Sequence, residues 1–581
     1  MMSAAWFTDH PPSERFPHYT RANAGEVLPT PASPLGQTLA FDEAILPGFQ
    51  LGSIRMGSYE AEDYRDGAPE MCGFFGGHFY INLSCVRMQA VRNPAITVEQ
   101  LDTAIFGARD DTPPYEPHPL DDKPHLLPIA EAHQGFVVTA TEWPELLEEK
   151  ERAAAIRANR PDLGALADDQ LLAHIRALVP VMLELTENQM IAAGSSGIAP
   201  GMLAGVAEAI GDPTLPMKVL SGLGDVDSAA PSFELWEMSR FVRDSGDLTA
   251  AFDAGIDAVV DLLADPLSDD ARAFEAAMDA FLYEFGSRGP NEWELSAHTW
   301  ETDQRLALVA IDRARLQPDE KSPDDGQAAM AAARGAAVEE ARRKLADLGD
   351  EEMAGMFEAA LVGGLMMVYR ERAKTTLVRV LHEVRMAARE LGRRHAEAGN
   401  LDDADHVFML TSEELDDFVA DPAAQRDRVA SRAADWAALW ELEPPFFIRD
   451  GAIPPLDTWP AKGHSGAAVA SVGDTLTGTP GSPGSVTGRA RLVTDPSDPP
   501  DLEPGDIMVA PLTDPAWTPL FLAVDGVVVN VGGQISHAVI VSRELGLPCV
   551  VSVADATERI PDGATIELDG AAGEVTIVAL P

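Results

Sequence analysis

A stretch rich in proline, glycine and serine, from about residue 446 to residue 484, separates two different sequence patterns. Before it, apolar residues recur at the 3.6-residue spacing of helices, in Ala-, Leu- and Glu-rich segments such as 168–193, 239–265, 326–349 and 352–400. After it, short apolar runs separated by turns predict strands. A chain of 581 residues is also too long for one core. The sequence therefore predicts a multidomain α+β protein with a linker at 446–475.

The part after the linker, residues 476–581, predicts a β/α domain. Its strand-like runs are 488–494, 506–511, 526–531, 548–553, 565–569 and 574–578. One helix lies among them at 536–545, closed by Gly546 with Pro548 just beyond. Residues 126–445 predict a mainly helical domain. Residues 1–125 combine proline, glycine and aromatic residues with short apolar runs such as 78–84, and predict an irregular, mixed region with some strand.

The overall composition excludes several functions. The chain has 43 basic and 94 acidic residues and a net charge of -51, which repels nucleic acid and anionic lipid. It has no run of eighteen apolar residues and no basic-then-apolar start, so we expect neither a membrane span nor a secretion signal. Cys72, Cys85 and Cys549 are too few and too scattered for a disulfide framework or a zinc site, and we expect a cytoplasmic protein.

The strongest chemical signal is the segment Gly532-Gly533-Gln534-Ile535-Ser536-His537, which follows the apolar run 526–531 and opens the predicted helix. The first N–H groups of a helix have no partner within the helix, and the helix dipole adds partial positive charge there. Such a place binds anions. A histidine at this position can attack phosphorus and hold a phosphoryl group over the free donors. The spacing alone is weak evidence, because any Gly-Gly turn before a helix would provide it.

The surrounding residues make the signal strong. In order, the segments 478–493, 502–521, 525–551 and 562–578 resemble the mobile, swivelling domain of phosphoenolpyruvate-utilising enzymes. The resemblance covers about residues 476–579. It implies that His537 is the phosphorylated histidine, that Gly532, Gly533 and Ser536 bind the phosphoryl group, and that the Thr513-Asp514-Pro515 turn supports the site. The alternative is the same fold with a vestigial histidine.

The earlier part of the chain resembles, at lower specificity, the acceptor-binding region of the rifampin phosphotransferase-like members of this family. The matching segments are 19–39, the strand-like 76–84 with His78 where arginine is common, 285–303, and 368–415. The resemblance suggests that Arg21 and Asn23 position an acceptor, and that Arg288, Glu292 and Glu294 line the place where His537 docks. Arg21 and Asn23 could equally cap a helix, and Arg288 with the glutamates could be a structural ion pair.

Two further cations, Arg370 and Lys374, lie one helical turn apart and are candidates for neutralising the transferred phosphoryl group. A solvated helix face is an equally good reading of them. Arg379 and Arg385 are weaker candidates. No residues have the spacing of a confident metal site, although Glu292 and Glu294 could hold Mg²⁺. We expect no cofactor tightly bound in this chain.

Two modules of the family have no counterpart in the sequence: the ATP-grasp nucleotide-binding domain and the phosphoenolpyruvate-binding barrel. We therefore expect a separate ATP-grasp subunit to phosphorylate His537 from Mg²⁺-ATP, and His537 to pass the group to a hydroxyl of a small organic acceptor in the helical part. The alternatives are a non-catalytic scaffold that keeps the fold, and an acceptor pocket adapted to lyase or cyclase chemistry. A sugar-transport phosphocarrier of the Enzyme I type is disfavoured, because there the histidine domain precedes a barrel.

Overall fold

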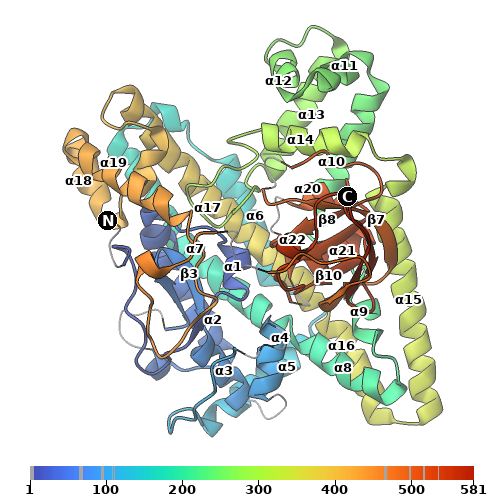
Figure 1. The fold of residues 1–581 in the computed structure, drawn as a ribbon. Coiled ribbons are helices and arrows are strands. Elements are labelled where there is room, and N and C mark those ends of the chain that lie inside the picture. The colour runs from blue at the N-terminus through green and yellow to red at the C-terminus, as the bar shows by residue number, and fades with distance from the viewer. Residues whose placement is uncertain are drawn as a thin grey trace. The chain divides into compact units, whose positions relative to one another are not determined.

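In the computed structural model the chain forms two compact units (Figure 1). The structure describes residues 5–581 except 65–69, 93–96, 107–108, 110, 463–466, 496–498, 514–516 and 534–535. Unit 1 comprises Met1–Ser195, Trp293–Ala297 and Arg372–His464, and unit 2 comprises Ser196–Glu292, His298–Glu371 and Ser465–Pro581. Each unit is assembled from segments that lie far apart in the sequence.

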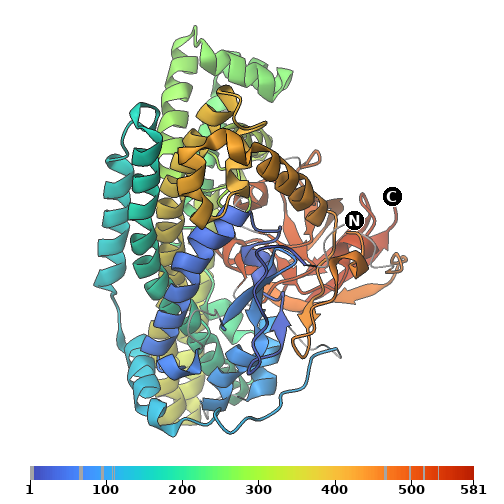
Figure 2. The same ribbon diagram turned by 90° about the vertical axis from the view of Figure 1, so that its left-hand side faces the viewer.

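Unit 1 is built around a small antiparallel sheet and a layer of long helices. The sheet has the order β2-β3-β1-β4, from Cys72–Phe75, His78–Asn82, Tyr19–Thr20 and Phe447–Ile448. Its α-helices are α1 (Ala24–Val27), α2 (Leu46–Arg55), α3 (Leu83–Arg92), α4 (Val98–Phe106), α5 (Leu127–Thr139), α6 (Pro144–Ala158), α7 (Asp168–Ser195), α18 (Leu415–Ala420) and α19 (Pro422–Leu439), with most of α17 (Leu365–Glu397). A π-helical segment, Gly36–Ile45, runs directly into α2, and both pack along α7 (Figure 2).

The core of unit 1 explains why these helices form. One face of each is apolar, and Leu39, Phe41, Met182, Leu381 and Val384 meet in a single buried cluster. Burying apolar surface in this way is the main favourable term in folding. Strand β1 pairs with β4, so residues 447–448 of the predicted linker are part of this sheet.

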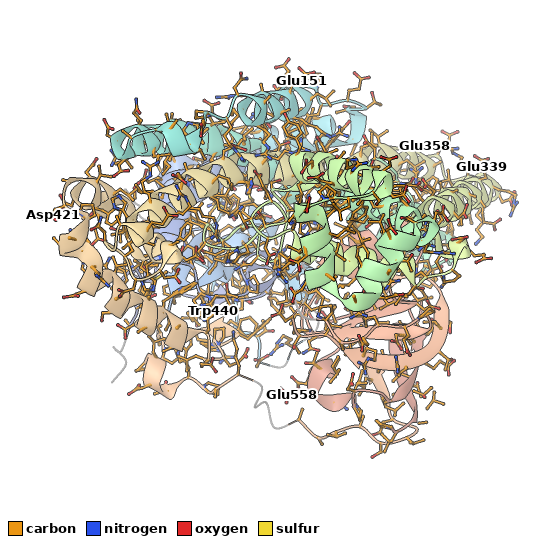
Figure 3. All side chains as sticks on the ribbon, turned by 90° about the horizontal axis from the view of Figure 1, so that it is seen from above. Glu151, Glu339, Glu358, Asp421, Trp440 and Glu558 are labelled. Carbon is orange, nitrogen blue, oxygen red and sulfur yellow. The ribbon has the colours of Figure 1, made fainter. Side chains whose placement is uncertain are left out.

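The helical part of unit 2 contains α8 (Ile198–Ile210), α9 (Leu215–Val219), α10 (Ala230–Asp244), α11 (Gly246–Ala254), α12 (Ile256–Ala264), α13 (Asp269–Phe285), α14 (Arg305–Arg315), α15 (Pro323–Leu348), α16 (Glu351–Gly363) and the start of α17. Glu339 and Glu358 project from α15 and α16 (Figure 3), and Arg342 bridges them. Charged side chains on these helices thus pair with one another at the surface.

The C-terminal part of unit 2 is a mixed sheet of eight strands in the order β5-β12-β11-β7-β8-β9-β10-β6. The strands are β5 (Thr475–Thr477), β6 (Thr479–Ser482), β7 (Ser485–Leu492), β8 (Asp506–Ala510), β9 (Gly526–Val529), β10 (Cys549–Val551), β11 (Thr565–Asp569) and β12 (Glu574–Ala579), and the helices are α20 (Thr518–Phe521), α21 (His537–Leu545) and α22 (Ala556–Arg559). Strands β7 to β10 run parallel. The predicted β/α domain at the C-terminus, after a mainly helical region, is confirmed.

The two faces of this sheet are both buried, as parallel strands require. On one face, Met508 and Val527 join an apolar cluster that also includes Leu235, Phe274 and Leu308 of the helices. On the other face, Ile507, Val509 and Val528 pack in a second cluster with α22. The sheet domain and helices α10–α14 therefore share one apolar core.

Two helical stretches, Asp168–Ile210 and Glu351–Glu397, are long and apolar enough to cross a membrane by length and composition alone. In each, 44% of the apolar window is buried inside the protein. Core helices of soluble proteins pass the same test, so this observation is weak evidence for a membrane protein.

Candidate active site around His537

The turn that carries His537 lies at the carboxyl edge of the parallel strands. Strand β9 ends at Val529, and α21 begins at His537 itself. Ligands of open α/β sheets commonly bind at this edge. The turn is tight: the Ser536 N–H donates to the Gly533 carbonyl at 3.0 Å, and a Cβ on Gly532 would come within 3.0 Å of the Ser536 hydroxyl and 3.2 Å of Val551. Gly532 does not have a positive φ. Glycine is therefore needed at this position for the close packing and not for an unusual backbone conformation.

Both ring nitrogens of His537 face threonine hydroxyls. Nδ1 lies 3.2 Å from Thr513 Oγ1, and Nε2 lies 3.0 Å from Thr518 Oγ1. The ring is 7% exposed, and the ring of Phe521 meets it edge-on at 6.0 Å. A hydroxyl can donate or accept, so the two threonines can pair with either tautomer of the ring. In either tautomer one ring nitrogen has a lone pair that could attack phosphorus.

Ser536 adds a donor to the same turn. It is 5% exposed, and its hydroxyl has no hydrogen-bond partner among the residues that the structure describes. A buried polar group without a partner is costly and calls for a ligand or water. This observation supports the predicted phosphate-binding role of Ser536. Asp514 and Pro515, which the resemblance placed in the supporting turn, lie outside the described residues, as do Gln534 and Ile535.

Arg543 holds helix α21 against strand β6. This residue is 4% exposed, and its Nε donates to the Gly481 carbonyl of β6 at 2.8 Å. Burial lowers the pKa of its guanidinium to about 10. The bond joins α21 to an edge strand from the start of the domain and so fixes the direction of the helix that His537 begins.

Arg288 and Glu292 form a buried ion pair in unit 2. Arg288 Nε lies 2.7 Å from Glu292 Oε2, and each residue is 1% exposed. The Arg288 backbone bonds to Phe285 and Trp300, and a Cβ on Gly289 would come within 2.7 Å of Thr299. The pair is thus held by a tight loop after α13.

Glu294 is held separately, in unit 1. Its carboxylate accepts bonds from the N–H and hydroxyl of Ser33 and of Ser296, and burial raises its pKa. Its backbone carbonyl accepts from Arg385 of α17 at 2.9 Å, and Arg385 also bonds to the Leu295 carbonyl. Among the described residues, no group of three or more His, Cys, Asp or Glu side chains could hold a metal ion.

Arg21 and Asn23 have structural contacts in unit 1. The Arg21 guanidinium donates to the carbonyls of Phe79, Leu28 and Pro29, and burial lowers its pKa. Asn23 occupies the N-cap position of α1 with a φ of 60° but makes no side-chain capping bond. These contacts favour the structural reading of Arg21, and the role of both residues toward an acceptor stays a prediction.

Arg370 and Lys374 both lie on α17, and each is partly exposed. Arg370 Nε is 3.9 Å from Glu371 Oε1. Sequence reasoning missed Thr518, which contacts the reactive ring, and Glu544, which is buried at the other end of α21. The only signal for Thr518 was a hydroxyl residue just after the Thr-Asp-Pro turn. Nothing in the sequence pattern indicated a partner for Glu544.

Two family models match parts of this chain. Residues 502–573 match the family model described as the PEP-utilising enzyme mobile domain. The C-terminal part of this chain is therefore similar to the mobile domain of phosphoenolpyruvate-utilising enzymes. Residues 189–371 match the model described as the fourth domain of rifampicin phosphotransferase. This part of the chain is thus similar to a domain of rifampicin phosphotransferase, as the sequence resemblance predicted.

Three relatives show the extent of the similarity. An uncharacterized protein of Mycobacterium tuberculosis is 34% identical over 312 residues, which are 54% of this chain and 32% of that protein. Rifampicin phosphotransferase of Streptomyces sviceus is 32% identical over 310 residues, 52% of this chain and 34% of the relative. That of Bacillus subtilis is 34% identical over 210 residues, 36% and 23% of the two chains. The matched part is about a third or less of the length of these relatives.

Proposed function

We propose that this chain is a phosphotransferase component in which His537 carries the phosphoryl group. A lone pair of the imidazole attacks phosphorus of ATP, a P–N bond forms, and the P–O bond to the nucleotide breaks. A hydroxyl oxygen of a small organic acceptor then attacks the same phosphorus, the P–N bond breaks and returns its electron pair to the imidazole, and the hydroxyl proton passes to a carboxylate such as that of Glu292. The observation that carries the proposal is His537 at the start of α21, next to Ser536, whose buried hydroxyl has no hydrogen-bond partner within the described part of the chain.

The proposed donor is an ATP-grasp nucleotide-binding partner that uses Mg²⁺-ATP, and the proposed acceptor site is in the helical part. Support for the acceptor site comes from the match of residues 189–371 to a domain of rifampicin phosphotransferase and from the buried Arg288–Glu292 pair in that region. The guanidinium can neutralise a transferring phosphoryl group, and the carboxylate can take the acceptor's proton or hold Mg²⁺. Three buried cysteines without disulfides fit the cytoplasm as the proposed location.

The test is labelling of His537. The full chain is incubated with a candidate ATP-grasp partner and with γ- and β-labelled ATP, and label that is acid-labile and base-stable is measured. We expect such label on the wild type and none on His537→Ala. The matched control is His406→Ala, which removes a partly exposed histidine outside the site and should keep the label. Label that survives in His537→Ala would contradict the proposal, and absence of label with every partner would favour the scaffold.

A further inference from the structure

Glu544 lies at the opposite end of the helix that His537 begins, and it is 2% exposed. Its two carboxylate oxygens have different partners on the helical part of unit 2. Oε1 accepts from the Leu223 backbone N–H at 3.1 Å, and Oε2 accepts from the Gly224 N–H at 3.1 Å. Burial raises the pKa of this carboxyl group, whereas the two backbone N–H donors and the positive charge of Arg334 on α15 favour its ionised form. A buried charge is tolerated only with such partners.

The turn that binds Glu544 has an unusual backbone. Gly222, Gly224 and Asp225 have φ values of 62°, 72° and 52°, all in the left-handed region. Turns of this kind direct successive N–H groups into one concavity that binds an anion. The turn also presses on α15, because a Cβ on Gly222 would come within 2.6 Å of the Ala331 nitrogen. It is therefore a preformed receptor for one carboxylate.

Helix α15 supplies a second contact to the same end of α21. A Cβ on Gly326 would come within 2.7 Å of the Leu545 carbonyl oxygen, so only glycine allows this approach. Gly335, on the same helix, has open space around it. In the middle of α21, Ile540 is buried in the apolar cluster that includes Leu220, Val338 and Val368. The carboxylate, the glycine contact and the apolar contact together seat one face of α21.

We propose that the Leu223–Gly224 turn and Gly326 form the docking surface on which the histidine domain rests, and that Glu544 is the positioning residue that holds His537 on the acceptor side. The role in transfer rests on the proposed function, whereas the docking contact does not. Since a phosphoryl donor must also reach His537, the contact must open. Water can satisfy both the Glu544 carboxylate and the two N–H groups after separation, which makes a carboxylate on backbone donors suitable for reversible docking.

Amide hydrogen exchange of the full chain tests the contact directly. In the wild type we expect slow exchange at Leu223 and Gly224. Glu544→Gln keeps the shape but has one acceptor oxygen and places an NH₂ group against a donor, so exchange at these two amides should become at least about tenfold faster. The control is Glu567→Gln, the same change at an exposed position of the same domain, which should leave it unaltered.

A second variant acts from the other side of the contact. Gly326→Ala places a methyl group against the Leu545 carbonyl and should speed exchange at Leu223 and Gly224 as Glu544→Gln does. Gly335→Ala makes the same substitution on the same helix in open space, and should not. Wild-type exchange in Glu544→Gln would overturn the role of Glu544, and wild-type exchange in both variants would overturn the docking surface.

Phosphoryl transfer then tests the positioning role. In Glu544→Gln, labelling of His537 should proceed as in the wild type, while loss of label to the acceptor slows by about tenfold or more. Transfer at the wild-type rate would show that docking is not required for it. If no variant and no wild-type chain is ever labelled, the proposed function fails, whereas the exchange results still decide the docking contact.

Discussion

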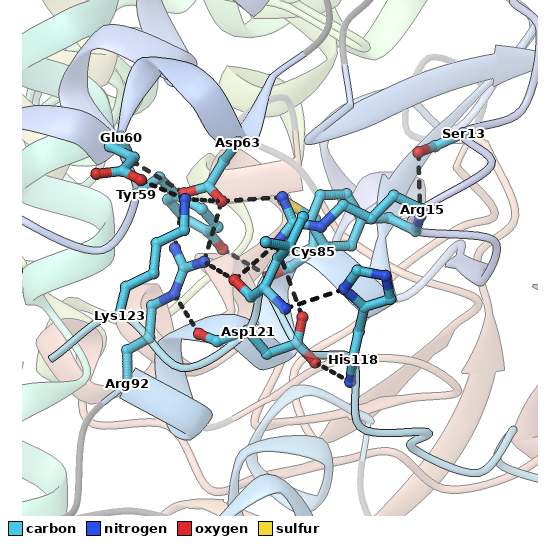
Figure 4. A network of polar contacts seen from close by, with 12 residues as sticks. Ser13, Arg15, Tyr59, Glu60, Asp63, Cys85, Arg92, His118, Asp121 and Lys123 are labelled. Atoms are coloured by element: carbon cyan, nitrogen blue, oxygen red, sulfur yellow. Dashed lines mark hydrogen bonds and ion pairs between the residues drawn. The ribbon is translucent and has the colours of Figure 1, made fainter.

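Asp63 shows how a single residue organises a buried polar network (Figure 4). Its side chain is fully buried and forms a bidentate ion pair with Arg92 at 2.8 and 3.0 Å. Arg15 at 3.0 Å and Lys123 at 2.8 Å also contact its carboxylate. Burial alone would raise its pKa, but hydrogen bonds from Arg92 and Lys123 outweigh this and hold the pKa well below its ordinary value of 3.8. The network joins α3 to the segments around residues 15, 63 and 123.

Asp63→Asn should destabilise unit 1 by about 3 kcal/mol, because removing one partner leaves buried cations without their counter-charge. Urea unfolding followed by circular dichroism measures this. Asp111→Asn, at an exposed pair with Arg109, is the control and should cost less than about 0.5 kcal/mol. A similar small cost for Asp63→Asn would contradict the assigned role.

The pH dependence of the same variant follows from the direction of the shift. A carboxyl group whose pKa is lowered by folding contributes its full stability above its unfolded value, and loses it as the pH falls through its folded value. The difference in stability between wild type and Asp63→Asn should therefore be constant from pH 7 to about pH 5 and shrink below about pH 4. A difference that grows as the solution is acidified would contradict the charged state of Asp63.

Arg288 is a second single residue whose role can be tested by substitution. We predict that Arg288→Ala leaves phosphorylation of His537 intact but slows onward transfer by roughly a hundredfold, about 3 kcal/mol, since a cation facing the phosphoryl group acts mainly in the transition state. Arg288→Lys, which keeps the charge, should recover part of the rate and guards against loss of folding. The control is Arg272→Ala at an exposed position. Wild-type transfer by Arg288→Ala would make the pair with Glu292 structural, and the acceptor site would be sought near Arg370 and Lys374.

At the scale of elements, the sequence predicted what depends on local pattern. The helices of 168–193, 326–349 and 352–400 follow their apolar spacing, and α21 begins at His537 and ends before Gly546, where the motif placed it. The strand at His78–Asn82 was also predicted. These segments needed no partner to be recognised, because turn residues and periodicity act over a few positions.

Elements that depend on distant partners were not predictable. Strand β1 has two residues and pairs with β4, more than four hundred residues away, which no local pattern encodes. The helical run Gly36–Arg55 was missed inside a region that appeared irregular. The contacts of Glu294 were not predictable for the same reason, because Ser33 and Arg385, which bind Glu294 and Leu295, are distant in the sequence.

At the scale of the whole molecule, the structure divides the chain differently from the composition. The composition separates residues 126–445 from 476–581, whereas the contacts place helices α10–α14 and the eight-stranded sheet in unit 2, where they share an apolar core. Opening this core exposes apolar surface to water, which costs free energy. Separation of the histidine domain from α10–α14 therefore needs compensating contacts elsewhere. A binding partner that covers the same face of the sheet domain would supply them.

The charge of the whole molecule bears on the phosphoryl donor. The 581 residues of this chain have a net charge of -51, which repels ATP in solution. Their sequence contains no glycine-rich nucleotide loop with a phosphate-binding lysine. We predict that this chain alone binds Mg²⁺-ATP more weakly than a Kd of about 10 μM, which corresponds to about 7 kcal/mol of binding free energy. Isothermal titration calorimetry measures the Kd at low and at high salt. If no nucleotide site exists, the Kd should change little when salt screens the repulsion. Tighter binding that His537→Ala retains would reveal a nucleotide site within the chain and would remove the need for a separate ATP-grasp partner.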